Sequence, residues 1–331
     1  MKNRGAALVT VLIIVFIVMA IIANLTVTNF RMIRRLENRQ LLEQATSIAF
    51  SALDFGRAGL GTSGATASMD TLQDVWAQPL PKVKILDGIF MSGFLIDEQG
   101  KFNLNDLIAS NGQVNTTVLK QFLLLLDYLN LPQSLAYNLA YYMAAPQYQS
   151  EIMQQYLSGS PAYRPAGRPL VDLSELILVK GVTPLIAQKM VQYVTAIPVA
   201  NLNLSESAVE SAPAGGFSAG VLVNANTATA EVIAAKSGVP LNVAQRMISA
   251  RLAQPFKTAQ SISAFLAQNG VYPTPPGAEV VINLATLSVT SSYFTIHALV
   301  DDQEDQFRWV AMVFRQNRSG QWPQILWQHP E

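Results

Sequence analysis

Charged residues are absent from one long stretch near the amino terminus of this chain. No Lys, Arg, Asp or Glu occurs between Arg4 and Arg31, and most residues in this interval are apolar. A helix over residues 6–30 would be about 37 Å long at the usual helical rise. This length is sufficient to cross the roughly 30 Å hydrocarbon core of a bilayer. Residues 6–30 are therefore predicted to be the transmembrane part of an amino-terminal helix.

The helical pattern continues after the apolar stretch. No glycine occurs between Gly5 and Gly56, so one continuous helix of about 50 residues is expected. A loop rich in small residues is expected after it, at residues 59–68. The carboxyl half of the helix is predicted to pack on a domain, because it carries a narrow apolar stripe formed by Leu41, Ala45, Ile48 and Ala52.

A hairpin pattern follows the helix. Val83–Leu86 and Ile89–Ile96 are apolar runs separated by the two residues Asp87 and Gly88. Asp-Gly between apolar runs is a good short-range signal for a two-residue turn between antiparallel strands.

Strand periodicity returns near the carboxyl terminus, at residues 282–328. Apolar residues alternate with polar ones over residues 294–300 and again over residues 307–313. The last run, residues 322–327, contains Pro323, which argues for an edge strand or its beginning. These strands are expected to complete one antiparallel sheet with the earlier hairpin.

The intervening residues, 105–280, have a helical character. Val118–Leu129 and Leu135–Met143 are the clearest helical runs. A stretch rich in Ser, Ala, Pro and Gly at Ser205–Gly220 is predicted to separate two all-α units.

These two units carry an internal duplication. Gly181–Met190 aligns without gaps on Gly238–Met247, and upstream Asn103–Ala109 resembles the segment that starts with Asn224–Thr227. The alternative is chance similarity between helical segments. The residues expected to cap the helices that follow the upstream motif are Asp106 and Thr227.

The amino-terminal boundary has the features of a processing site. Lys2 and Arg4 precede Gly5, and the apolar stretch begins at Ala6 without a break. This pattern is typical of a prepilin-type leader, residues 1–5, which predicts cleavage between Gly5 and Ala6 and methylation of Ala6. A secretory signal peptide would have a shorter apolar core followed by a small-x-small cleavage site. A plain amino-terminal anchor is the alternative.

Basic residues after the span complicate its orientation. Arg31, Arg34, Arg35 and Arg39 outnumber the two basic residues before it, which taken alone favours the opposite orientation. The leader motif takes precedence over this charge rule and predicts that the part of the chain after the span lies in the periplasm.

At this point the chain resembles type IV pilins and pseudopilins. In that family the fifth residue of the mature chain is usually Glu, which is thought to pair with the terminal amine of a neighbouring subunit. Thr10 occupies this position here. An unpaired carboxylate in hydrocarbon is costly, so a subunit without the Glu is expected where that pairing is not made, at the filament tip.

Residues Asn224–Phe265 also resemble helix-hairpin-helix domains that bind DNA. Those domains hold phosphate with the amides of a Gly-x-Gly hairpin, but Thr183 and Pro240 replace the second glycine in the two copies. Proline has no N–H to donate. Lys plus Arg equals Asp plus Glu at 22 each, so the chain lacks the basic excess of a nucleic-acid binder. No nucleic-acid partner is expected, and the repeats are interpreted as packing scaffolds.

Taken together, these features resemble the general secretion pathway protein K family, the large minor pseudopilin of type II secretion systems. The motifs that carry the resemblance are the leader without Glu, Asp97–Asn105, Glu175–Gly181, Val223–Ala228 and the carboxyl strands. The resemblance implies an α+β fold, in which a long amino-terminal transmembrane helix packs on a pilin-like antiparallel sheet interrupted by a large all-α insertion. The expected parts are a leader at 1–5, a transmembrane helix at 6–30, a pilin-like domain at 31–104 and 281–331, and SAM-like units at 105–215 and 221–280.

The sequence contains few other candidate sites. The chain has no cysteine, which excludes disulfides and cysteine nucleophiles. The family resemblance implies that calcium can bind, but the acids between Asp301 and Asp305 lack the alternating ligands of an EF-hand loop and are expected to form a solvated hairpin tip. His297 and His329 are the only histidines, and no hydrolase or metalloprotease motif accompanies them. No enzyme is predicted.

The predicted function is that of a minor pseudopilin at the tip of a periplasmic pseudopilus. It would be anchored in the bacterial inner membrane by a single span, processed by prepilin peptidase, and bound to the I and J minor pseudopilins that the resemblance implies. The alternatives are a membrane-tethered helix-hairpin-helix protein that binds DNA and a periplasmic hydrolase. The 331 residues, 50% hydrophobic, are sufficient for two or three domains.

Overall fold

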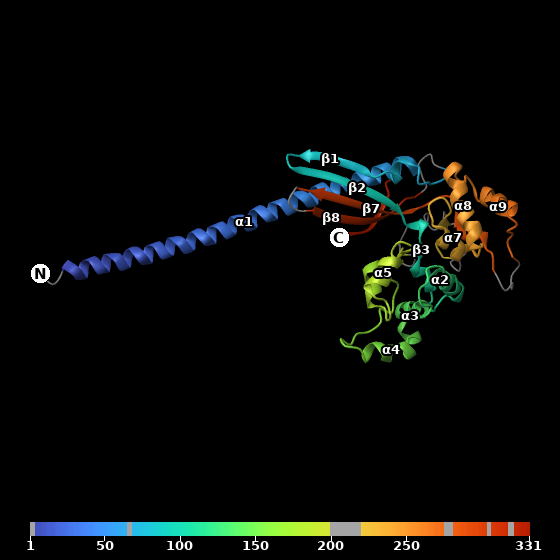
Figure 1. The fold of residues 1–331 in the computed structure, drawn as a ribbon, viewed down its shortest axis with the longest axis horizontal. Coiled ribbons are helices and arrows are strands. Elements are labelled where there is room, and N and C mark those ends of the chain that lie inside the picture. Colours follow the sequence, from blue (N-terminus) through green and yellow to red (C-terminus); the bar gives the residue numbers. More distant parts are fainter. Residues whose placement is uncertain (1–3, 65–67, 199–219, 275–280, 303–305, 317–320) are drawn as a thin grey trace.

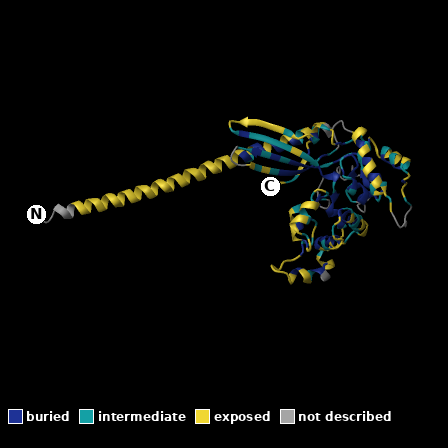
Figure 2. Ribbon diagram, in the orientation of Figure 1, coloured by how far each residue is buried: buried dark blue, intermediate teal, exposed yellow. Residues whose placement is uncertain are grey.

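A single long helix organises the molecule. The computed structural model describes residues 4–64, 68–198, 220–274, 281–302, 306–316 and 321–331. Helix α1, Arg4–Gly64, begins far from the folded body and ends within it (Figure 1). The amino-terminal part of α1 is bare, because every residue from Leu8 to Gln44 is exposed, as Figure 2 shows. The expected continuous helix is confirmed, but it is 61 residues long.

The folded part of α1 lies on a five-stranded antiparallel sheet. The strand order is β1-β2-β7-β8-β9, so each strand pairs with its neighbours in the list. The strands are β1 Leu80–Leu86, β2 Ile89–Asp97, β7 Tyr293–Asp301, β8 Gln306–Phe314 and β9 Gln324–Pro330. The hairpin and the antiparallel sheet predicted from the sequence are confirmed. Strand β9 is an edge strand that starts directly after Pro323.

Small residues bring α1 close to the sheet. Ala45, Ala49 and Ala52 are buried against it, whereas Leu41, expected in the same stripe, is 40% exposed. A Cβ atom on Gly56 would lie 2.9 Å from Cγ2 of Ile296 in β7, so the close approach requires glycine. The apolar contacts between α1 and the sheet stabilise this part of the helix, although Gly56 itself disfavours helix.

The loop predicted at residues 59–68 begins later than expected. Helix α1 continues through Gly59 and Gly61 to Gly64, and Leu60 is fully buried in the core between helix and sheet. Glycine disfavours helix, but the packing of Leu60 outweighs this local preference. Arg57 adds a further anchor, because its Nε donates to the carbonyl oxygen of Pro323 at 2.9 Å.

A helical body is inserted between β2 and β7, two strands that are paired with each other. It lies at the end of the sheet that is remote from the amino terminus (Figure 1). Its helices are α2 Thr116–Tyr128, α3 Ser134–Met143, α4 Ser150–Leu157, α5 Pro184–Met190, α7 Ala230–Ser237, α8 Leu241–Ala253 and α9 Ala259–Gln268. Its short helical turns are η2 Glu98–Gly100, η3 Leu104–Leu107, η4 Pro146–Tyr148, η5 Leu173–Leu178 and η6 Leu284–Thr286, and a further turn, η1 Val75–Ala77, precedes the sheet.

Two short parallel pairs of strands tie this body together. Strand β3, Phe102–Asn103, pairs with β4, Val194–Thr195. Strand β5, Val223–Asn224, pairs with β6, Leu287–Ser288. Each unit of the duplication thus starts with a two-residue strand that meets the end of the same unit.

The two helical units share one hydrophobic core. Buried residues of α2 and α3 belong to the same cluster as those of α7, α8 and α9. A separate cluster joins α1 to the sheet. The helical units are therefore packed on each other rather than held apart, and the predicted separating stretch at Ser205–Gly220 lies outside the described residues except for Gly220.

Candidate functional site

The anchor helix carries the residues predicted for processing and assembly. Gly5 and Ala6 lie in the first turns of α1, and Thr10 lies on its exposed part. The described part of the chain contains one helix that is long and apolar enough to cross a membrane. Length and composition are thus consistent with the predicted anchor.

The aligned repeat segments have matching local structures. Gly181 and Gly238, equivalent in the alignment, both have left-handed backbones with φ of 87° and 75°. Three residues later α5 begins at Pro184 and α8 begins at Leu241, which are also equivalent positions. The same backbone geometry at both glycines followed by helices in the same register supports duplication rather than chance similarity.

The upstream motif forms an amide clamp in the first copy. Asn105 Nδ2 donates to the carbonyl oxygen of Leu170 at 2.9 Å, and Oδ1 accepts from the N–H of Leu170 at 2.8 Å. Asn105 is buried. One carboxamide therefore satisfies both backbone groups of a residue 65 positions away and closes the first unit.

The second copy repeats this clamp. Asn226 Nδ2 donates to the carbonyl oxygen of Phe256 at 2.9 Å, and Oδ1 accepts from the N–H of Phe256 at 2.9 Å. The first asparagine of each motif also acts alike, because Asn103 Oδ1 accepts from the N–H of Asn105 and Asn224 Oδ1 accepts from that of Asn226. The recurrence of Asn-x-Asn in the sequence was the signal for this arrangement.

The predicted helix caps at Asp106 and Thr227 are wrong. The N-cap of α2 is Asn115, and the N-cap of α7 is Thr229. Asp106 and Thr227 occupy the fourth position of the repeat motif, where their side chains bind partners outside their own unit. Long-range bonding of these side chains replaces the local capping role that their residue types suggest.

In the first copy the outward bond is a buried ion pair. Lys236 Nζ in α7 lies 2.9 Å from Asp106 Oδ2, and both side chains are 0% exposed. The same oxygen accepts from the N–H of Val221 at 2.8 Å, and Asn103 Nδ2 donates to Asp106 Oδ1. Lys236 Nζ also lies 5.1 Å from the centre of the Phe102 ring. This pair joins the first helical unit to the second.

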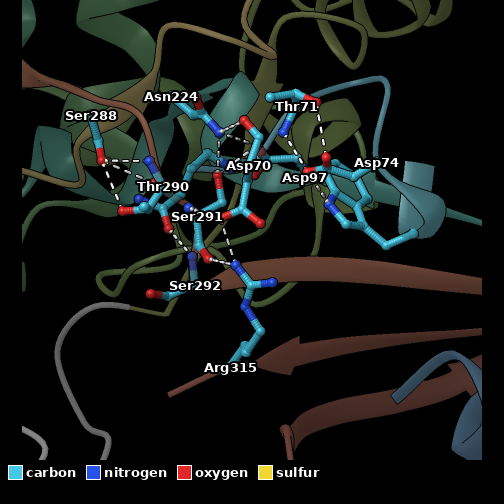
Figure 3. A network of polar contacts seen from close by, with 12 residues as sticks. Asp70, Thr71, Asp74, Asp97, Asn224, Ser288, Thr290, Ser291, Ser292 and Arg315 are labelled. Carbon is cyan, nitrogen blue, oxygen red and sulfur yellow. Dashed lines mark hydrogen bonds and ion pairs between the residues drawn. The ribbon is translucent and has the colours of Figure 1, made fainter. Parts of the chain in front are cut away.

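In the second copy the outward bonds reach the sheet. Thr227 Oγ1 donates to Asp97 Oδ2 at 2.6 Å, and Asn224 Nδ2 donates to the same oxygen at 3.2 Å. Asp97 is the last residue of β2, and Ser291 Oγ, just before β7, donates to it at 2.6 Å (Figure 3). We name Asp70, Asp97, Asn224, Ser291 and Arg315 the polar junction.

A second carboxylate completes the polar junction. Arg315 Nη2 lies 2.6 Å from Asp70 Oδ2, and both side chains are only 2% exposed. The Ser291 N–H donates to the same oxygen at 2.8 Å, and Arg315 Nη2 also donates to the Ser291 carbonyl oxygen. Figure 3 shows these side chains converging from the segment before η1, from the segment before β7 and from the end of β8. They hold the helical body against the end of the sheet.

Asp97 differs electrostatically from Asp106. Burial raises the pKa of Asp97 to about 6, and the hydrogen bonds from Ser291 and Thr227 offset part of this effect. Its side-chain donors are the neutral groups of Asn224, Thr227 and Ser291, whereas Asp106 binds a lysine ammonium. Asp97 therefore lacks the cationic partner that Asp106 has.

Two residues of the helix-hairpin-helix resemblance, Arg251 and Gly238, have structural roles. Arg251 is buried, and its Nη1 donates to the carbonyl oxygens of Ala225 and Ala228 at 2.7 and 2.6 Å. Burial lowers the pKa of Arg251 to about 10. The hairpin at Gly238 packs against the backbone of Val281. Arg251 and the hairpin at Gly238 therefore make their contacts within the protein itself.

The candidate metal and catalytic residues are dispersed among the described residues. Asp301 lies 2.6 Å from Lys82 Nζ at the end of the sheet that is away from the helical body. Part of the acidic tip lies outside the described residues. His297 Nδ1 lies 3.6 Å from Glu331, and His329 Nε2 lies 3.8 Å from Asp172. Burial lowers the pKa of His297. In the described part of the chain, no three His, Asp or Glu side chains gather in a way that could hold a metal ion.

Comparison with known proteins identifies a single family. Residues 100–199 and residues 223–282 match two models of this family, both described as type II secretion system (T2SS), protein K. A Pseudomonas aeruginosa protein called type II secretion system protein K is 30% identical over 282 residues, which cover 81% of this chain and 78% of that relative. A second relative, from Escherichia coli strain K12, is 26% identical over 71% of this chain and 75% of its own length.

A solved structure has the same fold. It is a chain from the GspK-GspI-GspJ complex of the enterotoxigenic Escherichia coli type 2 secretion system, and the TM-score is 0.66. The match covers 90% of this chain and 99% of that one at 21% sequence identity. The long helix, the antiparallel sheet and the helical insertion are therefore features of a known architecture.

Proposed function

The chain belongs to the type II secretion system protein K family, and from this premise we propose that it is a minor pseudopilin at the tip of a periplasmic pseudopilus. The family is one of structural pseudopilins, so the chain is a structural protein and not an enzyme. Its anchor helix would lie in the bacterial inner membrane, and its folded body in the periplasm.

The position of the helical body is the observation that carries the tip assignment. This body covers the end of the sheet that is remote from the amino terminus of α1 (Figure 1). A further subunit stacked on that end would meet the helical body, whereas the side of α1 that does not face the sheet stays open. One such subunit can begin or end a filament, but it does not leave room for repeated stacking.

This proposal implies two binding partners. The similar solved chain was crystallised in a complex with GspI and GspJ, and we expect this chain to bind the corresponding minor pseudopilins. Gel filtration of residues 30–331 with the soluble bodies of those partners tests it directly. Co-elution at micromolar concentration supports the proposal, and separate elution in both calcium-containing and calcium-free buffer contradicts it.

Processing of the leader is a second part of the proposal. We expect prepilin peptidase to cleave between Gly5 and Ala6 and the new amino terminus at Ala6 to be methylated. Mass spectrometry of the membrane-extracted protein measures this end directly. A mature terminus near Ala23 would show an ordinary signal peptide instead.

Thr10 supports the tip position by its chemistry. A carboxyl group at this depth in the hydrocarbon would cost a few kcal/mol unless it were paired. A tip subunit lacks the neighbour whose amine would neutralise a Glu, so Thr10→Glu should not improve secretion. A Thr10→Glu variant that incorporates along the filament like a major subunit would contradict the tip position.

We propose in addition that the SAM-like units lie at 105–215 and 221–280, that calcium can bind to the folded body, and that the chain has no nucleic-acid partner. The alternative of a membrane-tethered DNA-binding protein predicts salt-dependent retention of the folded body on duplex DNA. The burial of Arg251 and the packing of Gly238 favour the pseudopilin over that alternative.

A further inference from the structure

A set of arginines lies on the bare part of α1, directly after the apolar stretch. Arg31, Arg34, Arg35 and Arg39 are all exposed, and the first residue of α1 after them that is buried by the folded body is Ala45. The sheet therefore does not cover these arginines. Their partners must come from outside the described part of the chain or from α1 itself.

Helical geometry places three of these arginines at the depth of lipid headgroups. If the hydrocarbon core ends near Phe30, Arg31 to Arg35 fall within about 8 Å of its boundary. The headgroup layer on each side of a bilayer is about 5 to 8 Å thick. Arg39 lies about 13 Å beyond the boundary, outside this layer.

Intrahelical pairing leaves this set with an excess of positive charge. Arg34 Nη1 lies 3.4 Å from Glu37 Oε2, and Arg39 Nε lies 3.0 Å from Glu43 Oε1. Arg31 and Arg35 have no carboxylate partner among the described residues. Between Arg31 and Glu37, three guanidinium groups thus face a single carboxylate.

We propose that Arg31, Arg34 and Arg35 bind the headgroups of anionic phospholipids in the bilayer leaflet that faces the folded body. The three residues have i, i+3 and i+4 spacing, so they lie on one face of the helix. A guanidinium group binds phosphate oxygens in a bidentate manner, and the apolar stems of the side chains can lie along the adjacent hydrocarbon. The proposal rests on the membrane span in the proposed function.

This site would hold the helix at a fixed depth after processing. Removal of residues 1–5 takes away Lys2 and Arg4, which are the basic side chains on the other flank of the span. The arginine set is then the one basic anchor next to the apolar stretch. Lipid binding would thereby fix how far the folded body stands above the membrane.

The test uses the full-length protein in vesicles of phosphatidylcholine that contain a minor fraction of phosphatidylglycerol. Electron paramagnetic resonance of spin-labelled lipids gives the relative association of each lipid with the protein. We expect each arginine to favour phosphatidylglycerol over phosphatidylcholine roughly fivefold, as about 1 kcal/mol per basic residue implies. The preference should fall as salt is raised.

Two single variants form a matched pair. Arg35→Gln removes an arginine without a described partner inside the headgroup layer, and Arg39→Gln removes a paired arginine outside it. Arg35→Gln should lower the lipid preference and Arg39→Gln should leave it unchanged. The triple variant Arg31→Gln, Arg34→Gln, Arg35→Gln should show equal association of both lipids.

Flotation of the vesicles separates this inference from the membrane assignment. Protein that does not float with vesicles would overturn both. Protein that floats but shows no preference for phosphatidylglycerol would overturn the lipid site alone. The inference is also overturned if the triple variant keeps its lipid preference and loses association with other minor pseudopilins, because the arginines would then bind protein.

Discussion

The two copies of the duplicated motif are alike in how each closes its own unit and differ in what each binds outside it. Asn105 and Asn226 make the same pair of hydrogen bonds to one distant residue. At the fourth position, Asp106 binds Lys236 of the other unit, whereas Thr227 binds Asp97 of the sheet. The two copies thus share the internal clamp but differ at the fourth position. Asp106 connects the first unit to the second, and Thr227 connects the second unit to the sheet.

The outward bond of the first copy should give the largest effect when it is broken. Lys236→Met leaves Asp106 buried without its cation, which should lower the free energy of unfolding by about 3 to 5 kcal/mol. Urea unfolding of the folded body measures this. Arg168→Met is the control, because the side chain of Arg168 is half exposed and the loss of its pair with Glu175 should cost less than about 1 kcal/mol. An equal, small effect of both variants would show that the buried pair does not join the units.

The internal clamps should come next. Asn105→Ala and Asn226→Ala each leave a buried N–H and a buried carbonyl without partners, which should cost about 2 to 4 kcal/mol. Asn111 is the exposed control, since its Oδ1 accepts from the N–H of Gln113 and its Nδ2 donates to Gln113 Oε1. Asn111→Ala should cost less than about 1 kcal/mol. If only one of the two buried variants is destabilised, the clamps are not equivalent.

The outward bond of the second copy should depend on pH. The pKa of Asp97 is raised from 3.8 to about 6 in the folded protein, so the folded state binds more protons than the unfolded state between these values. Its contribution to stability is therefore present below about pH 4 and lost as pH rises through about 6, a change on the order of 2 to 3 kcal/mol. The difference in unfolding free energy between the native protein and Asp97→Asn should change across this window. If the unfolding free energies of the two proteins change with pH in parallel, the raised pKa of Asp97 is contradicted.

The smallest expected effects distinguish the role of Thr227 from that of Thr229, which is the N-cap of α7. Thr229→Ala removes the cap of α7 and should cost about 1 kcal/mol at every pH. Thr227→Val removes a hydrogen bond that lowers the pKa of Asp97, so the pH window of that residue should move upward. Chemical shifts of the Asp97 carboxyl carbon follow this titration. A Thr229→Ala variant with the same upward shift would remove the distinction.

The sequence predicted the elements whose signals are local. The turn at Asp87-Gly88, the alternation in the strands near the carboxyl terminus and the uncharged run after Gly5 each depend on neighbouring residues, and each corresponds to an observed element. The end of α1 was placed too early, because burial of Leu60 against the sheet is a tertiary effect that outweighs the glycines around it.

The polar junction could not be predicted in the same way. Asp70 and Arg315 are 245 positions apart, and neither lies in a motif that names its partner. The spacing of the Asn-x-Asn motif did indicate a repeat, but the sequence alone suggested caps for Asp106 and Thr227. Their bonds to Lys236 and Asp97 depend on how two units pack, which local pattern does not contain.

The central claim is that this protein ends the pseudopilus rather than repeating along it. Gold labelling of the folded body on isolated pseudopili, read by electron microscopy, measures its position and its copy number per filament. The proposal predicts label at one end of each filament and none along its length. Label distributed along the filament would contradict the tip assignment while leaving membership in the protein K family intact.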